Sequence, residues 1–275
     1  MDQMPPFALN HMTAPALRWD ALIALAARTG CIGIEFRNDL GRPLFDGFAQ
    51  AEVKSALSDA GLRLLALAEV KAFNDGSERA LVEAEALADI AVACGAEAIS
   101  LIPRNDGQRI DPGDVRDDLS VALAQLRPIL ETRGLMGLIE PLGFESCGLR
   151  HKADVAAVID EMGASDTFAL VHDTFHHHLA GGGPMFPAMT GLVHISGVAD
   201  ASLGPDLMRD SHRGLVDSDD QLSNIAQIRA LLASGYTGPI SVEAFSPTVH
   251  ALSDPEAALS GSFNFIASNL AQEAA

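Results

Sequence analysis

The chain has 275 residues, of which 48% are apolar and 20% are charged. This length and composition fit one large domain or two small ones with a sizeable buried core, and they exclude a disordered chain. The 37 Asp and Glu residues outnumber the 18 Lys and Arg residues, and the net charge of −19 repels phosphate backbones and anionic lipid headgroups. Nucleic acid and membranes are therefore not expected partners.

The three cysteines, Cys31, Cys94 and Cys147, lie far apart and lack the paired spacing of a zinc module. We interpret them as reduced structural thiols, which are usual in a cytoplasmic protein. The N-terminal residues show no basic segment followed by an apolar one, and no apolar run reaches the roughly 18 residues that a membrane helix needs. These features predict a cytoplasmic protein that is neither exported nor inserted into a membrane.

One unit recurs along the chain: a short apolar strand, a polar loop, a helix rich in Ala and Leu, and a glycine. The expected strands are Phe7–Asn10, Ile32–Phe36, Leu62–Val70, Ala98–Ile102, Met136–Glu140, Phe168–Asp173, Leu192–Ser196 and Ile240–Ala244. The expected helices lie near Ala16–Thr29, Gln50–Ala60, Ser77–Cys94, Val115–Arg133, Ala153–Met162, Gln221–Ser234 and Pro255–Leu270, with a weaker one around 175–181.

A glycine follows six of these helices, where a left-handed residue is needed to turn the chain back. These glycines are Gly30, Gly61, Gly95, Gly134, Gly163 and Gly235. Such regular punctuation favours a closed (β/α)₈ barrel over an open doubly wound sheet. No Gly-x-Gly-x-x-Gly follows the first strand, which argues against a dinucleotide-binding fold. With no linker in the chain, we predict an α/β protein whose residues 1–275 form a single TIM barrel domain with a parallel eight-stranded core.

Four potential metal ligands end four successive strands: Glu140, Asp173, His194 and Glu243. Catalytic groups of α/β barrels gather at this carboxyl edge, and strand alternation points the three carboxylates inward. A single glutamate after a strand is more often a helix cap or part of a loop salt bridge, but four ligands at one edge favour a site. Converging carboxylates repel one another without a cation, so we predict one divalent metal ion. The ligand types suit Mn²⁺, Mg²⁺, Co²⁺ or Zn²⁺.

A histidine cluster follows the second ligand. His176 comes three residues after Asp173, so one turn of chain brings its ring to the same pocket, as a substrate hydrogen-bond donor or as a partner of a ligand. We expect His177 and His178 on a solvated loop surface. His172 should face outward from its strand and make a hydrogen bond behind it.

Two segments, 181–184 and 206–220, are expected to form loops over the barrel mouth. In the second loop, Arg213 or His212 is positioned to close over an anionic or hydroxyl-rich ligand, although a surface arginine fits equally well. Further polar groups suited to a polyol end the first three strands, and ion pairs such as Glu35 with Arg37 are an alternative for them. These rim residues are Asn10 and His11, Glu35 and Arg37, and Glu69 and Lys71.

Several segments resemble the xylose-isomerase-like barrel superfamily of sugar isomerases and epimerases, over nearly the whole length of the chain. They are Gly-Ile-Glu35-Phe-Arg, Ile-Glu140-Pro-Leu-Gly-Phe, His-Asp173-Thr-Phe-His176, Val-His194-Ile-Ser and Gly235-Tyr-Thr-Gly-Pro-Ile-Ser-Val-Glu243. The Glu-Pro-Leu-Gly-Phe and Asp-Thr-Phe-His segments are most similar to the inosose (2-keto-myo-inositol) isomerase branch.

The resemblance implies a single divalent metal and a set of substrate contacts. The implied metal ligands are Glu140, Asp173, His194 and Glu243, and the implied substrate contacts are His176 and Arg213. Two positions depart from the family pattern. Gly197 stands where an acidic residue is frequent, and Leu215-Val-Asp-Ser replaces a Pro-Gly-x-Gly segment. Both departures bear on the identity of the substrate more than on the metal.

Three functions follow as hypotheses. The first is an isomerase or epimerase in which the metal stabilises an enediolate while Glu140 and Glu243 remove and return the proton. The second is an apurinic-endonuclease-like phosphodiesterase, which is disfavoured because strands three and four end without histidines for further metals and because the chain is acidic. The third is a non-catalytic sugar-binding barrel. One Trp and one Tyr offer few stacking surfaces, so a small polyol or ketose is the expected substrate. A homodimer is an alternative to a monomer, since such barrels often dimerise.

Overall fold

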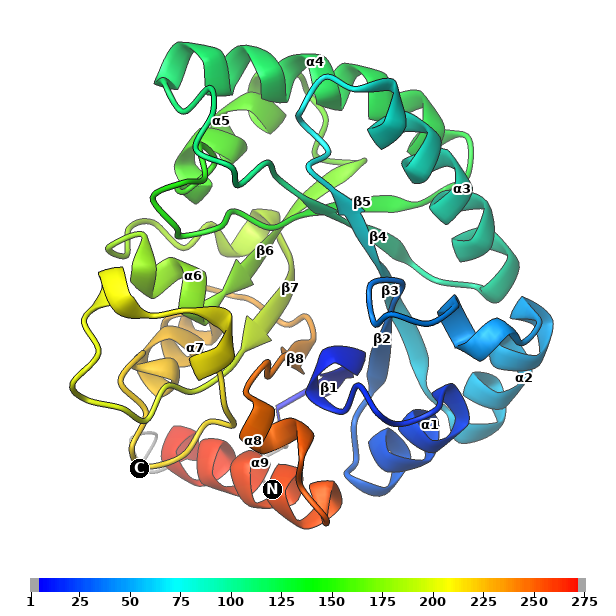
Figure 1. The fold of residues 1–275 in the computed structure, drawn as a ribbon, viewed down its shortest axis with the longest axis vertical. Helices are drawn as coiled ribbons and strands as arrows, with labels where there is room; N and C mark the ends of the chain where they lie inside the picture. The colour runs from blue at the N-terminus through cyan, green and yellow to red at the C-terminus, as the bar shows by residue number, and fades with distance from the viewer. Residues whose placement is uncertain (1–4, 272–275) are drawn as a thin grey trace.

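The computed structural model describes residues 5–271, which form a closed barrel of eight parallel strands with helices around it (Figure 1). The strands are β1 (Phe7–Asn10), β2 (Gly33–Arg37), β3 (Arg63–Lys71), β4 (Ala98–Ile102), β5 (Met136–Ile139), β6 (Phe168–Asp173), β7 (Thr190–Ile195) and β8 (Ile240–Val242). The helices are α1 (Trp19–Arg28), α2 (Gln50–Ala60), α3 (Glu78–Cys94), α4 (Pro112–Glu131), α5 (Lys152–Glu161), α6 (Thr174–Leu179), α7 (Asn224–Ala233), α8 (Pro247–His250) and α9 (Pro255–Ala271).

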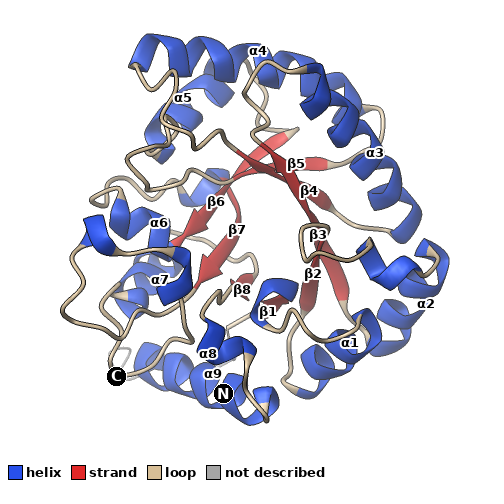
Figure 2. Ribbon diagram, viewed as in Figure 1, coloured by secondary structure: helices blue, strands red, loops and turns tan. Residues whose placement is uncertain are grey.

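The strand order confirms the predicted (β/α)₈ barrel. Each strand pairs in parallel with the next, and β1 pairs with β8 to close the ring (Figure 2). The bounds of β1, β4 and β6 are those expected. Three strands, β5, β7 and β8, end one or two residues earlier than expected, so Glu140 and Glu243 lie just after the strands that carry them. The short helix α8 was not expected. It begins after Ser246, whose side chain accepts a hydrogen bond from the Thr248 N–H.

Local signals in the sequence set the helix ends. The Ser77 hydroxyl caps α3 by accepting a hydrogen bond from the Ala80 N–H. The six glycines predicted to end helices all have positive φ, from 55° at Gly163 to 94° at Gly235. Gly61 and Gly95 are the C-cap residues of α2 and α3, and the other four glycines follow the last helical residue by two or three positions. Each adopts the left-handed conformation without steric cost, and the chain turns back toward the next strand.

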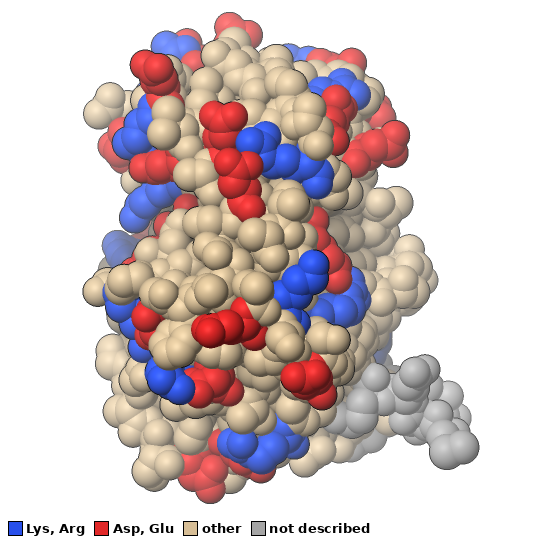
Figure 3. Space-filling model, turned by 90° about the vertical axis from the view of Figure 1, so that its right-hand side faces the viewer, with Lys and Arg blue, Asp and Glu red and all other residues tan. Residues whose placement is uncertain are grey.

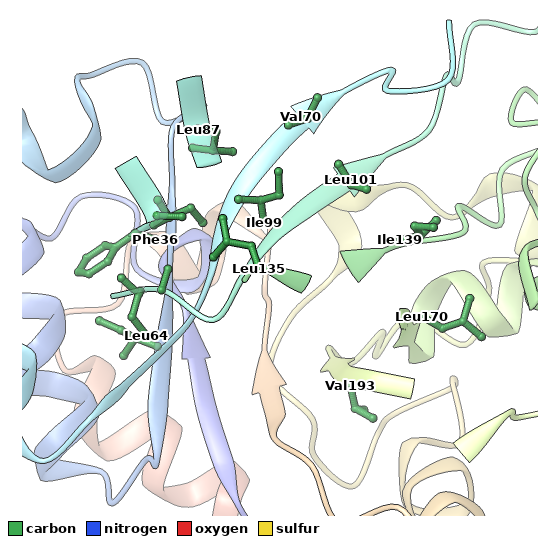
Figure 4. Packing of buried hydrophobic residues seen from close by; sticks show 14 of the residues in the cluster. Phe36, Leu64, Val70, Leu87, Ile99, Leu101, Leu135, Ile139, Leu170 and Val193 are labelled. Atoms are coloured by element: carbon green, nitrogen blue, oxygen red, sulfur yellow. The ribbon is translucent and has the colours of Figure 1, made fainter. Parts of the chain in front are cut away.

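Apolar side chains pack on both sides of the sheet. Outside the barrel, Ile99 and Leu101 of β4 and Ile139 of β5 pack in the core between strands and helices, near Leu87 of α3 (Figure 4). Inside the barrel lies a separate buried cluster of smaller total size. Its members are Ala8, Leu65, Ala66, Ala98, Leu138, Ala169, Val171 and Leu192. The inner cluster fills the barrel below the carboxyl edge, so polar chemistry is confined to that edge.

On the face drawn in Figure 3, acidic and basic side chains are interspersed. None of the helices within residues 5–271 is both long and apolar enough to cross a membrane.

The three cysteines are free and buried. Burial raises the pKa of each thiol to about 11, which keeps the thiols protonated and unreactive at neutral pH.

Candidate metal centre

The structure brings the four predicted ligands together at the carboxyl ends of β5 to β8. One ligand atom from each of Glu140, Asp173, His194 and Glu243 lies within 4.8 Å of the others, and all four residues are buried. Three carboxylates and one imidazole in so small a space form an oxygen-rich ligand set for one divalent ion.

The hydrogen bonds of His194 fit a metal ligand. Its Nε2 lies 3.0 Å from Glu35 Oε2, so this nitrogen carries the proton that the carboxylate accepts. Its Nδ1 is buried, has no hydrogen-bond partner, and lies 3.3 Å from Glu243 Oε2 and 3.6 Å from Glu140 Oε2. A lone pair facing two carboxylates is unfavourable unless a cation or a proton lies between them. The residues present therefore fit a metal bound at Nδ1.

The two glutamates experience opposite electrostatic environments. Burial and the neighbouring Glu243 carboxylate raise the pKa of Glu140 to about 7. Burial also acts to raise the pKa of Glu243, but His194 and Arg213 outweigh it and hold this pKa well below its usual value. Burial opposes the charged form of His194, yet the surrounding carboxylates raise its pKa well above the usual value. At neutral pH the metal-free centre therefore holds protons.

Metal affinity should consequently rise with pH. Because the pKa of Glu140 is raised to about 7 and that of His194 is also raised, protons occupy the centre below these values and must leave before the metal binds. Calorimetric titration with Mn²⁺ across neutral pH, in two buffers of different ionisation enthalpy, measures the affinity and the released protons together. An affinity independent of pH, with no buffer-dependent heat, would contradict this electrostatic account.

Two buried arginines hold the ligand carboxylates. Arg213 Nη2 donates to Asp173 Oδ2 at 2.5 Å and to Glu243 Oε2 at 2.9 Å, and Arg37 Nη1 donates to Glu243 Oε1 at 2.7 Å. The sequence analysis gave an ion pair between Glu35 and Arg37 as an alternative, and the structure does not show this pair.

Arg37 instead donates to the carboxylates of Asp39, Glu69 and Glu243. Glu35 accepts hydrogen bonds from His194 and Ser241. Sequence reasoning placed Arg37 at the rim but missed its role. Strand alternation places Glu35 and Arg37 on the same inward face of β2, and this is the feature of the sequence from which a role of Arg37 at the centre could have been predicted.

Glu35 should strengthen metal binding through its hydrogen bond to His194. Glu35→Gln removes the charge that fixes the His194 ring and its tautomer, so we expect Mn²⁺ to bind about 10- to 100-fold more weakly. The exposed Glu52→Gln variant is the matched control and should bind Mn²⁺ as the unmodified protein does. Equal affinities for the two variants would rule out this role.

His176 faces the centre from α6. Its Nδ1 accepts a hydrogen bond from the Gly143 N–H at 3.2 Å, so Nε2 carries the ring proton and lies 3.9 Å from Glu140 Oε1. Its backbone N–H donates to Asp173 Oδ1 at 2.8 Å. The expectation of a solvated loop for His177 and His178 is wrong: both lie in α6 and are half-buried. Asp173 caps this helix, so the chain passes directly from β6 into α6.

Gly143 is a position where a side chain cannot fit. A Cβ there would lie 2.3 Å from the His176 carbonyl oxygen and 2.6 Å from Leu179 Cβ. We expect Gly143→Ala to shift α6 and to destabilise the fold by about 1–3 kcal/mol. Urea denaturation measures the change in the free energy of unfolding. The control is Gly113→Ala in α4, where an added Cβ meets no atom within 4 Å. Indistinguishable results for the two variants would contradict the prediction.

A cavity of about 460 Å³ opens above the centre. Phe144 and Phe245 form apolar walls, and both arginines of the centre border it. Of the predicted substrate contacts, His176, Arg213 and Lys71 line this cavity. Asn10 and Glu35 are not among its lining residues. The Asn10 side chain instead accepts a hydrogen bond from the Met12 N–H at 3.0 Å.

The two departures from the family pattern lie in contact with each other. The backbone of Gly197 pairs with Gly214 through reciprocal hydrogen bonds of 2.7 and 2.9 Å. A Cβ at Gly197 would lie 2.5 Å from the Leu215 carbonyl oxygen. The glycine therefore allows the loop that carries Arg213 to lie directly on the end of β7, which places the guanidinium at the ligands.

Residues 23–269 match the family described as Xylose isomerase-like TIM barrel, and the chain belongs to this family. It is 23% identical over 220 residues, 75% of each chain, to an inosose isomerase of Halalkalibacterium halodurans. Among solved structures it is similar to a xylose isomerase domain containing protein of Salmonella typhimurium LT2, with a TM-score of 0.87, 29% identity and 99% coverage of both chains. It also shares the fold of the IolI protein with a bound zinc atom, with a TM-score of 0.83, 18% identity, and 97% and 99% coverage.

Proposed function

We propose that this protein is a divalent-metal-dependent isomerase or epimerase of a small ketose or inosose. The observation that carries the proposal is the pair Glu140 and Glu243, which belong to one candidate ligand set and both border the same cavity. Their environments move their pKa values in opposite directions. Two carboxyl groups whose pKa values differ in this way are suited to removing and returning one proton.

A divalent ion held by the four ligands would stabilise the negative charge that develops on the substrate oxygens when the adjacent carbon loses its proton. Glu140 and Glu243 approach the cavity from different strands and transfer the proton. His176 donates its Nε2–H toward the substrate, and Arg213 keeps Asp173 and Glu243 in place. The relative named inosose isomerase and the zinc atom in the IolI structure support this reading.

The charges around the cavity favour an uncharged substrate. Arg37 and Arg213 are committed to the ligand carboxylates, and Arg104 donates to the Asp75 carbonyl oxygen at 2.7 Å. Acidic residues outnumber basic ones in the lining. Lys71 is the remaining basic residue of the lining, so a phosphate group would meet this one lysine among more numerous acidic side chains, whereas the hydroxyl groups of a polyol form hydrogen bonds with both acidic and basic groups.

The phosphodiesterase hypothesis needs several metals. Within residues 5–271, a single group of three or more potential ligands is close enough to share an ion. We therefore propose one metal per chain, with Mn²⁺, Mg²⁺, Co²⁺ and Zn²⁺ all compatible with the ligands, and a substrate other than nucleic acid. Metal analysis of the purified protein tests this number.

Isotope exchange tests the function. Metal-loaded protein is incubated in D₂O with a panel of inososes and free ketoses, and NMR follows the hydrogen next to the carbonyl group. We expect deuterium to replace that hydrogen in at least one compound, and chelation to stop the exchange. If no compound exchanges with any of the four metals, the proposed chemistry is wrong. A non-catalytic sugar-binding barrel predicts that result together with metal-independent ligand binding.

A further inference from the structure

A second, smaller cavity lies beside the metal centre and is lined by residues at the start of α5 and in helix α6. Its volume is about 140 Å³, and Arg150, Lys152 and His177 line it together with residues 182–184. Asp173 and His176 form the wall toward the centre. The proposed function makes no use of this cavity.

The hydrogen bonds around Lys152 can be assigned completely. Gln227 Nε2 donates to the carbonyl oxygens of Thr174 and Leu222 at 3.1 and 2.8 Å, so its Oε1 is the acceptor for His172 Nε2 at 2.9 Å. Because His172 Nε2 donates to this oxygen, its Nδ1 is left to accept a hydrogen bond from Lys152 Nζ. This network matches the expectation that His172 bonds behind its strand. It uses one hydrogen of the Lys152 ammonium.

Neither cation at this cavity has an acidic partner. Lys152 is only 7% exposed, and within residues 5–271 no carboxylate lies within 4.0 Å of it or of Arg150. Arg150 donates to the carbonyl oxygens of Gly143 and Leu179, which are neutral. Burial lowers the pKa of Lys152 to about 7, and the more distant Asp173 carboxylate offsets this shift only in part, so an anion in the cavity would favour the ammonium form. A buried ammonium without a counter-charge is costly, and this chain has 19 negative charges in excess.

The backbone adds positive potential at the same place. Helix α5 has ten residues and begins at Lys152, and its N-cap residue His151 makes no side-chain capping hydrogen bond. Lys152 and Ala153, the first two residues of the helix, line the cavity, so the positive end of the helix dipole lies beside it, and Asp154 in the first turn offsets part of this potential.

We infer that this cavity binds a small oxyanion, a carboxylate or a phosphate, through Lys152, Arg150 and the start of α5. The anion supplies the counter-charge that the protein lacks at this place, and it accepts the two hydrogens of the Lys152 ammonium that His172 leaves unused. The volume of about 140 Å³ restricts the ligand to a small ion.

Lysine NMR tests this inference directly, because the chain has only three lysines. Protein labelled with ¹³Cε-lysine and loaded with Mg²⁺ is titrated with inorganic phosphate and, separately, with acetate at neutral pH. We expect a saturable shift of the Lys152 signal with at least one anion, while the signal of the exposed Lys54 stays in place. A Lys152 signal that does not move, or that moves without saturation together with the Lys54 signal, would overturn the inference.

Thermal denaturation provides a second measurement. The anion that shifts Lys152 should raise the Tm of the unmodified protein and of Lys54→Met, and this rise should be absent in Lys152→Met and Arg150→Gln. An equal rise in Lys152→Met would show that the anion acts elsewhere and would refute the site. Where a variant does not fold, the NMR titration of the unmodified protein decides. The result is independent of the proposed catalytic activity.

Discussion

Glu140→Gln and Glu243→Gln should each lower the rate of hydrogen exchange by a factor of about 10² to 10⁴. Glutamine keeps the shape and one oxygen ligand of glutamate but neither accepts nor returns a proton. The rates are measured in D₂O at saturating Mn²⁺, with the bound metal quantified in each variant, so that a loss of proton transfer is distinguished from a loss of metal.

The control for these variants is Glu145→Gln, which changes an exposed residue outside the ligand set. It should exchange at the rate of the unmodified protein. Exchange that persists unchanged in both Glu140→Gln and Glu243→Gln would remove the basis for assigning the proton transfer to this pair.

Arg213→Met should destabilise the metal-free protein by about 3–5 kcal/mol, because it leaves buried carboxylates without their cation. Arg213 is 1% exposed and bonds both Asp173 and Glu243. Bound Mn²⁺ supplies the missing positive charge, so the loss should be smaller in the metal-loaded protein. Urea denaturation with a chelator and with excess Mn²⁺ gives the two free energies of unfolding.

The control here is Arg209→Met in the same loop. Arg209 is exposed and donates to the backbone oxygens of Asp206 and Met208, so its loss should cost less than about 1 kcal/mol in either condition. A loss of stability in Arg213→Met that is the same with and without Mn²⁺ would argue against charge compensation by this arginine.

The grouping of the four candidate metal ligands could be predicted from the sequence because its signals are local. A short apolar run that ends on an ionisable residue predicts a strand and its carboxyl end, and alternation along the strand predicts the inward face. These two rules brought Glu140, Asp173, His194 and Glu243 to one place. The strands carrying Glu140 and Glu243 end one residue before them, yet the side chains still reach the centre.

The contacts of the polar residues at the ends of the first three strands could not be predicted from the sequence in the same way. Arg37 and Glu243 are 206 positions apart in the chain, and they meet only because β2 and β8 both flank β1 in the closed ring. Alternation gives the face of a side chain but not the carboxylate it reaches across the barrel. For this reason the sequence suggested an ion pair with Glu35, whereas the structure gives that carboxylate to His194.

The burial of polar residues outside the strands could not be predicted from the sequence either. Lys152 opens a helix, where a lysine is usually solvated, and its burial depends on His172 and Gln227, which come from other parts of the chain. His177 likewise lies beside His172, with ring centroids 4.8 Å apart, because α6 folds back onto β6. No local pattern distinguishes such residues from solvated ones.

One measurement tests the central claim that four side chains bind one divalent ion. Crystals of the Mn²⁺-loaded protein are measured at the manganese absorption edge, and the metal content of the same preparation is determined. We predict one anomalous peak per chain, bonded to Glu140, Asp173, His194 Nδ1 and Glu243. Protein without bound metal, or a peak located away from these four side chains, would contradict the account.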